Sequence, residues 1–203
     1  RPRTWRKVRR WSFIGAASLF ALMIIGSFAL SSLVGTGGGS TGGGWPTSYV
    51  EGVGIPVPLL NPEHVPDGQT VSYNSIPPTS GAHWDRWANC GIYVEEVPDE
   101  RIVHNLEHGH VVISYNFSET EDITRMERLA RDLPELNSWG VVRPYAKIDE
   151  GSVALAAWGV IDLVQGVDEE RIRGFYGTYT RNLFSPETAN LGRAIPCQAD
   201  HSS

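Results

Sequence analysis

The chain has 203 residues, of which 41% are hydrophobic and 10% aromatic, a composition that excludes a disordered protein and suits one folded domain with additional segments. The formal net charge is -6, yet the first ten residues carry six of the 17 basic side chains and no acidic one. The rest of the chain, with 11 basic against 23 acidic residues, would repel a phosphate backbone, so we expect no nucleic-acid partner. Two cysteines are too few for a disulfide-dense miniprotein or a four-cysteine zinc module.

The first predicted element is a transmembrane helix at Trp11–Val34, a run without a charged residue. As a helix it would be about 36 Å long, which is enough to cross a hydrocarbon core of about 30 Å. The basic segment 1–10 before it should stay in the cytoplasm, and the C-terminus should then lie outside. A cleaved signal peptide is the competing interpretation, but the run is longer than the apolar part of such a peptide. We therefore expect an uncleaved, single-pass anchor in the lipid bilayer.

Residues 35–44, GTGGGSTGGG, form a glycine-rich linker that is typical of a flexible tether. The remaining residues, 45–203, are predicted to form an extracytoplasmic domain, in the periplasm or at the cell exterior. Its first part, to about Pro78, is rich in proline and glycine, which indicates extended segments and turns.

A helix is predicted to begin at Pro98 and to run to about His108, because Gly109 is a natural residue just past a helix end. The apolar run His110–Tyr115 then predicts a buried strand.

A second helix is expected from a capping box formed by Ser118 and Glu121. Strands are predicted near Val141–Tyr145 and Val153–Val160, and Asp168 opens a third helix. The two helices would bury apolar stripes, made of Ile123, Met126, Leu129 and Leu133 in one, and of Ile172, Phe175, Tyr176, Tyr179 and Leu183 in the other. With the tail from Ser185 mostly loop, a small sheet and about three helices predict a compact α+β domain.

The two cysteines, Cys90 and Cys197, lie near opposite ends of the folded region. On the oxidising, outer side of the membrane they are expected to form a disulfide, which would hold the C-terminal tail on the domain. The alternative leaves Cys90 as a thiolate ligand beside the histidines.

Four of the six histidines fall within 28 residues: His83, His104, His108 and His110. His104 and His108 are four residues apart on the predicted helix, so both imidazoles project from one face and can hold one transition-metal ion. His83, in a rigid proline- and glycine-rich turn, is a candidate third ligand. Glu107 is a candidate fourth ligand or orienting group, and His110 a further candidate. Copper and zinc are the expected ions, because both accept imidazole.

Three other interpretations of this cluster remain open: a structural hydrogen-bond network, a metal-free acid/base site, and a zinc hydrolase. The last rests on His104-Asn105-Leu106-Glu107-His108, which matches H-x-x-E-H, the inverted zinc-protease motif in which the glutamate activates a metal-bound water. The early end of the predicted helix disagrees with that motif's usual context. Met126 is a possible soft ligand for copper, although its place on an apolar stripe favours the core.

The segments YNSIPPTSGAH (73–83), CGIY (90–93) and VHNLEHG (103–109) resemble a bacterial family known as domain of unknown function 3105. The resemblance covers roughly residues 45–190, and it implies a membrane-anchored or exported protein. It implies no particular reaction. It places His83, His104 and His108 in the family signature, and His110 just outside it.

The sequence thus predicts a membrane-anchored extracytoplasmic protein that binds one transition-metal ion as a carrier, a sensor or a structural site, and an enzyme is the less expected outcome. An accessory subunit of a larger respiratory or photosynthetic membrane complex is the first alternative, and a zinc metallohydrolase that uses Glu107 is the second.

Overall fold

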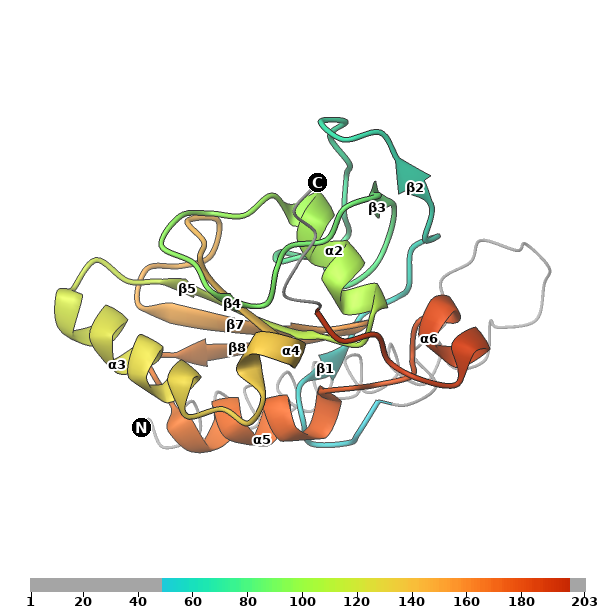
Figure 1. The fold of residues 1–203 in the computed structure, drawn as a ribbon. Helices are drawn as coiled ribbons and strands as arrows, with labels where there is room; N and C mark the ends of the chain where they lie inside the picture. Colours follow the sequence, from blue (N-terminus) through green and yellow to red (C-terminus); the bar gives the residue numbers. More distant parts are fainter. Residues whose placement is uncertain (1–48, 198–203) are drawn as a thin grey trace, which may run out of the picture. The chain divides into compact units, whose positions relative to one another are not determined.

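The computed structural model describes residues 49–197, which form a six-stranded mixed sheet with helices on both faces (Figure 1). From one edge to the other the strands are β1 (Ile55–Pro56), β8 (Val160–Gln165), β7 (Ser152–Ala157), β5 (Val111–Asn116), β6 (Gly140–Pro144) and β4 (Gly91–Ile92). The β4–β6 and β5–β6 pairs are parallel and the other pairs antiparallel. A second, two-stranded parallel sheet joins β2 (His64–Val65) to β3 (His83–Trp84).

One helix covers one face of the large sheet, and two cover the other. Figure 1 shows α2 (Asp99–Glu107) above the sheet, with α3 (Thr120–Arg131) and α5 (Glu169–Tyr179) below it. Two short helices complete the described residues, α4 (Leu136–Trp139) and α6 (Pro186–Leu191). The α+β class is therefore as predicted, with five helices in the described part of the chain instead of about three.

The central strand β5 is buried on both faces, so it begins with three consecutive apolar residues, Val111–Ile113, instead of alternating apolar and polar ones. Val111 and Ile113 contribute to the core under α3 and α5, and Val112 contributes to the core under α2. The core under α3 and α5 also contains residues of the neighbouring strands and most of the stripes predicted for the two helices, in which Met126, Leu129, Ile172, Phe175, Tyr176 and Tyr179 are buried. Each such side chain contributes about 1.5–3 kcal/mol through its burial.

Local structure differs from the predictions at four places. The run predicted as one strand, Val153–Val160, contains most of β7, the turn at Trp158-Gly159 and the first residue of β8, because Gly159 has a φ of +69° and reverses the chain. Ser118 caps no helix: its hydroxyl donates to Glu150, and α3 begins at Thr120. Leu183 lies beyond α5 and is exposed.

The fourth difference is α6, which replaces the expected loop after Ser185. The Ser185 hydroxyl accepts a hydrogen bond from the Thr188 amide and caps the helix, and Pro186 occupies its first position.

A buried ionic network holds the start of α2. The guanidinium of Arg143, fully buried on β6, donates to Asp99 Oδ1 over 2.7 Å and to the Val97 carbonyl. Tyr145 and Lys147 donate to Asp99 Oδ2 over 2.9 and 2.8 Å. Burial acts to raise the pKa of Asp99, but the two cations outweigh it and lower that pKa below its usual value. The helix that carries three of the predicted ligands is thus fixed at its first residue.

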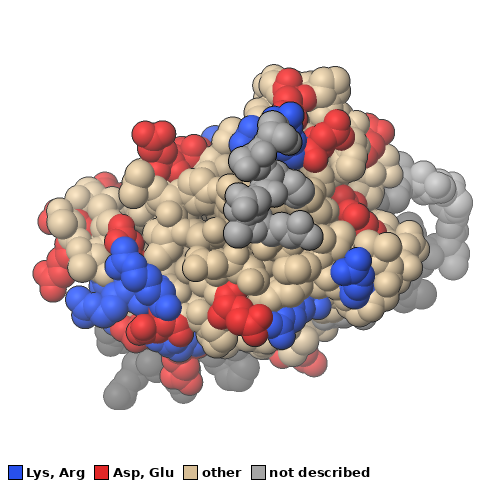
Figure 2. Space-filling view, viewed as in Figure 1, with Lys and Arg blue, Asp and Glu red and all other residues tan. Residues whose placement is uncertain are grey.

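Charged groups on the surface are interleaved, as Figure 2 shows for one face. Exposed pairs such as Arg125–Glu169 and Arg131–Glu127 contribute little, typically less than about 1 kcal/mol each. The core, rather than these pairs, holds the domain together.

The predicted basic segment 1–10, the anchor Trp11–Val34 and the linker 35–44 lie outside the described residues. Within residues 49–197 no helix is long and apolar enough to cross a membrane.

Candidate metal centre

The last turn of α2 presents His104, Glu107 and the capping residue His108. The chain then leaves the helix at Gly109, whose φ of +89° suits a residue without a side chain. The amides of Gly109 and His110 donate to the Leu106 and Asn105 carbonyls, which completes a Schellman cap. A Cβ at position 109 would lie 2.6 Å from the Asn182 carbonyl oxygen, so the turn also needs glycine for space.

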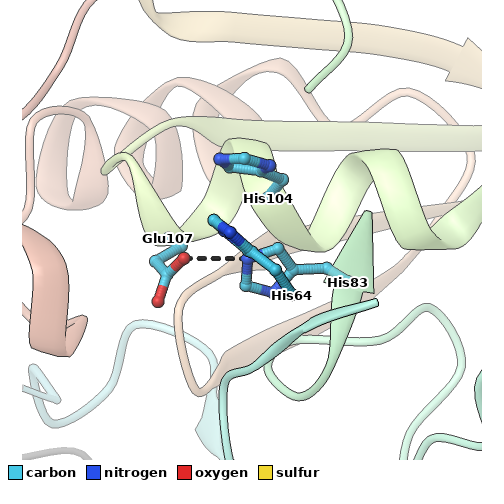
Figure 3. A group of neighbouring side chains, drawn as sticks. All are labelled: His64, His83, His104 and Glu107. Atoms are coloured by element: carbon cyan, nitrogen blue, oxygen red, sulfur yellow. Dashed lines mark ion pairs between the residues drawn. The ribbon is translucent and has the colours of Figure 1, made fainter. Parts of the chain in front are cut away.

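The small sheet brings two further imidazoles to the same helix face. The register of β2 against β3 places His64 directly beside His83, although they are 19 residues apart in the sequence. The β3 strand in turn packs against α2. In Figure 3 the side chains of His64, His83 and His104 point toward one another, with Glu107 beside them.

The loop between β3 and β4 is held against α2 by one buried amide. Asn105 accepts a hydrogen bond from the Ala88 amide and donates one to the Ala88 carbonyl, both over 2.8 Å. These two bonds fix the loop that carries Trp87. The Trp87 ring then lies 5.2 Å from the His104 ring and 4.5 Å from the His108 ring, centroid to centroid, and covers both on one side.

The three imidazoles form a nearly equilateral triangle. Ring centroids are 4.9 Å apart for His64 and His83, 5.0 Å for His64 and His104, and 4.8 Å for His83 and His104. In each ring Nδ1 faces an oxygen. The partner is an Asp85 carboxylate oxygen at 3.0 Å for His64, the Gly81 carbonyl at 2.8 Å for His83, and the Trp84 carbonyl at 2.6 Å for His104.

These contacts determine which nitrogen is available to a ligand. A carbonyl or carboxylate oxygen only accepts, so Nδ1 donates in all three rings and keeps its hydrogen. In the neutral imidazole the lone pair is then on Nε2. An oxygen partner behind each ring is the arrangement that orients histidine ligands in metal sites.

Glu107 meets this triangle through His83. Its Oε2 lies 2.9 Å from His83 Nε2, and both groups are buried. Nε2 nevertheless has no hydrogen-bond partner among the described residues. A buried carboxylate and a nitrogen lone pair that face each other repel unless a positive charge lies between them or on one of them. A metal cation can bind both groups at once.

The four residues His64, His83, His104 and Glu107 each offer one donor atom, and these atoms lie within 4.8 Å of one another. Ligand atoms of a tetrahedral zinc site with bonds of 2.0–2.1 Å are about 3.3 Å apart. A separation at the 4.8 Å limit would have to shrink by about 1.5 Å when an ion binds. The set fits a transition metal with three nitrogen donors and one oxygen donor.

A second group overlaps the first. His108 Nε2 lies 3.1 Å from His104 Nε2 and 3.3 Å from Oε2 of Glu187, a residue of α6. The donors of His104, His108 and Glu187 also lie within 4.8 Å of one another. Burial and the nearby Glu107 raise the pKa of Glu187, as expected where two carboxylates share a small volume.

The protonation states suit metal binding. Burial, followed by the adjacent His108 and the other histidines, lowers the pKa of His104 to about 3. Burial and the neighbouring His110 and His83 lower the pKa of His108 to about 3 as well. Both rings are therefore neutral at pH 7, and a neutral imidazole is the form that binds a metal.

The structure thus brings four of the five predicted ligands together and separates the fifth. His110 donates from Nε2 to the Ile195 carbonyl over 2.7 Å, and its Nδ1 accepts from Asn105 over 3.0 Å. Because both ring nitrogens are used, His110 has none left for an ion shared with His104. Met126 is buried in the core under α3 and is not part of the cluster.

Cys90 and Cys197 form a disulfide with an S–S distance of 2.03 Å. Among the described residues no cysteine is free, so the alternative of a Cys90 thiolate ligand does not hold in this structure.

Two members of the cluster escaped the sequence analysis. His64 lies outside the 28-residue run, and no local spacing relates it to His83. Glu187 does have a signal, since Ser185 followed by Pro186 is typical of a helix start and places Glu187 in its first turn.

Comparison with known proteins gives a family and no function. No curated protein and no solved structure matches the chain. The model of the family described as "protein of unknown function (DUF3105)" matches residues 64–192, a span that includes every member of the cluster from His64 to Glu187. As this span is more than half of the 203 residues, the chain belongs to that family.

Proposed function

We propose that the domain binds one transition-metal ion, zinc or copper, through Nε2 of His64, His83 and His104, with Glu107 as the fourth ligand. The observation that carries this proposal is the shared orientation of the three rings, each with Nδ1 held by an oxygen and Nε2 left for the ion. His110 is bonded to the protein through both ring nitrogens. Nε2 of His83, by contrast, faces the proposed ligand Glu107. Nε2 of His104 is paired with His108, a contact that a bound ion would replace.

The donor set supports a transition metal over calcium or magnesium. Calcium and magnesium prefer oxygen ligands, whereas this group offers three imidazole nitrogens and one carboxylate. Zinc and Cu(II) both accept such a set. Among the described residues no sulfur atom is available as a softer ligand, because the cysteines are paired and Met126 is in the core.

The role of a carrier or sensor fits better than that of a purely structural site. His83 and His104 are almost fully buried, but the side chain of His64 is 52% exposed. A structural site encloses its ion with four fixed ligands. Here one ligand lies at the surface, so the ion can be exchanged without unfolding the domain.

The domain is proposed to act outside the cytoplasmic membrane, held there by the anchor Trp11–Val34. The Cys90–Cys197 disulfide supports this location, because such bonds persist in oxidising compartments. The basic residues before the uncharged run support the orientation.

The test is a binding measurement on the full chain in mild detergent. The metal-free protein is titrated with Zn(II) and with Cu(II), desalted, and analysed for metal content. One ion per chain is expected, and His104→Ala should lower the affinity at least about 100-fold, because this change removes a ligand. Glu95→Gln, at an exposed acidic residue in the loop after β4, is the matched control. Uptake that is absent, or equal in wild type and His104→Ala, would refute the proposal.

A zinc hydrolase is the second candidate, and one observation favours it. Glu187 gives His104 and His108 a third ligand, and two histidines with one glutamate form a known catalytic zinc set. Against it, the carboxylate that would act as base, Glu107, lies against His83. Glu107→Gln separates the two: a hydrolase would lose peptide cleavage and keep its zinc, whereas a binding protein loses zinc affinity.

A further inference from the structure

The cluster holds two donor sets, and they share one residue, His104. The first, which we name the primary position, consists of His64, His83, His104 and Glu107. The second, which we name the side position, consists of His104, His108 and Glu187. His104 Nε2 is the donor that faces His108 Nε2 at 3.1 Å.

His104 has only one lone pair to offer. Its Nδ1 keeps a hydrogen, because it donates to the Trp84 carbonyl over 2.6 Å. An imidazole nitrogen with one lone pair binds one metal ion. An ion in the primary position and an ion in the side position therefore exclude each other.

We infer that the chain holds one metal ion that passes between these two overlapping positions, with His104 as the ligand common to both. This inference rests on the proposed function and adds a path by which the ion enters and leaves. Because His104 stays bound throughout, the ion exchanges its other ligands one after another and is never released into an apolar interior.

The side position should be the weaker of the two. It has three donors instead of four. To bind an ion through Nε2, His108 must carry its hydrogen on Nδ1, and this buried nitrogen has no hydrogen-bond partner among the described residues. An unpartnered buried donor is costly, so the ion spends little time there.

The ion-free protein fills the same contact with a hydrogen bond. Because His104 Nε2 has a lone pair, the hydrogen between the two nitrogens belongs to His108 Nε2, which donates over 3.1 Å. An ion that binds His104 Nε2 replaces this hydrogen bond, and in the side position the His108 hydrogen moves from Nε2 to Nδ1. The lone pair of His104 Nε2 therefore accepts a hydrogen bond from His108 when no ion is bound.

The third donor of the side position is held in place and reaches the surface. The Ser185 hydroxyl donates to the backbone carbonyl of Glu107, which ties the start of α6 to the end of α2. Glu187 follows two residues later, and its side chain is 37% exposed. It can thus meet an ion at the surface and deliver it to His104.

When two positions exclude each other, the observed association constant of the chain is the sum of the association constants of the two positions. The test uses this sum. If the primary position is at least as strong as the side position, Glu187→Gln alone lowers the Zn(II) affinity of the full chain no more than two-fold. In a variant with a weakened primary position, His64→Ala/His83→Gln, the same change should lower the remaining affinity ten-fold or more. Competition with a chromophoric chelator measures both, with Glu95→Gln as the control in each background.

A kinetic measurement needs only one variant, Glu187→Gln, at a partly exposed side chain. Transfer of bound Zn(II) from Glu187→Gln to excess chelator should be about ten-fold slower than from wild type, at nearly equal affinity. Two ions per chain would overturn the inference, as would equal transfer rates or no further loss in the double-variant background. Each of these results leaves the proposed function standing, whereas a wild-type chain that binds no Zn(II) refutes both.

Discussion

Removal of the disulfide should destabilise the domain strongly and change metal binding little. Cys90 and Cys197 are separated by 107 residues, and the bond joins the loop before β4 to the C-terminal tail. The ligands of the primary position come from α2, β2 and β3, none of which lies in that tail. The double substitution Cys90→Ala/Cys197→Ala therefore separates folding stability from the site.

The magnitude follows from loop closure. In the chain-entropy model a closed loop of this length raises the free energy of the unfolded state by about 5 kcal/mol at 25 °C. The tail also contributes hydrogen bonds, from the Ile195 amide to the His108 carbonyl and from the Cys197 amide to the Ser138 carbonyl. Because these bonds can form without the disulfide, we expect a net loss of about 3–5 kcal/mol.

Urea unfolding of the metal-free full chain, followed by near-ultraviolet circular dichroism of the tryptophans, measures the loss. Under reducing conditions the free energy of unfolding of the wild type should fall toward that of the double variant. The Zn(II) affinity of the folded double variant should stay within about ten-fold of wild type, the lower end of effects seen for changes outside the ligand shell. A loss of stability below about 1 kcal/mol would refute the loop-closure reasoning.

Three further predictions concern the surroundings of the site. Burial lowers the pKa of His104, His108 and His110, so the metal-free fold binds fewer protons than the unfolded chain between about pH 3 and 6.5. Stability is therefore complete above pH 6.5 and falls with acidification. We expect a loss of about 2–4 kcal/mol from pH 7 to 5.5, and urea midpoints that do not change with pH would contradict this. Asn105→Ala leaves both polar groups of the Ala88 backbone unpaired and should cost about 3–5 kcal/mol, measured in the same way; a loss under 1 kcal/mol would mean that water replaces the amide. Gly109→Ala should cost more than about 2 kcal/mol, from the left-handed backbone and the close carbonyl, and a neutral effect in thermal unfolding would show that this turn can shift.

The helices were predictable where a local signal marks their ends. Gly109 ends α2, and the Asp168 side chain accepts a hydrogen bond from the Arg171 amide at the start of α5. The β7–β8 hairpin was missed because Trp158-Gly159 lies inside an apolar run, where the turn residue is the only interruption. Periodicity alone cannot detect a two-residue turn between two buried strands.

The site was predictable where it lies on one helix, and in His83, which its proline- and glycine-rich turn marked as a candidate. His104 and His108 share a face because of the helical period, and Glu107 lies between them. His64 reaches the site through strand pairing, and Glu187 through the bond between Ser185 and the end of α2. These are tertiary contacts, which no spacing in the sequence encodes.

His110 shows the converse limit. It follows the helix closely in sequence, but the Gly109 turn directs the chain into β5, and the ring nitrogens pair with Ile195 and Asn105. Proximity in sequence therefore overestimated its part in the site.

The most direct test of the central claim is X-ray absorption at the metal edge of the Zn(II)-loaded full chain. We expect four nitrogen or oxygen neighbours at 2.0–2.1 Å, with the outer-shell scattering of imidazole rings. That imidazole scattering should weaken in His104→Ala. Sulfur neighbours near 2.3 Å, or a shell of oxygen atoms without imidazole scattering, would contradict it.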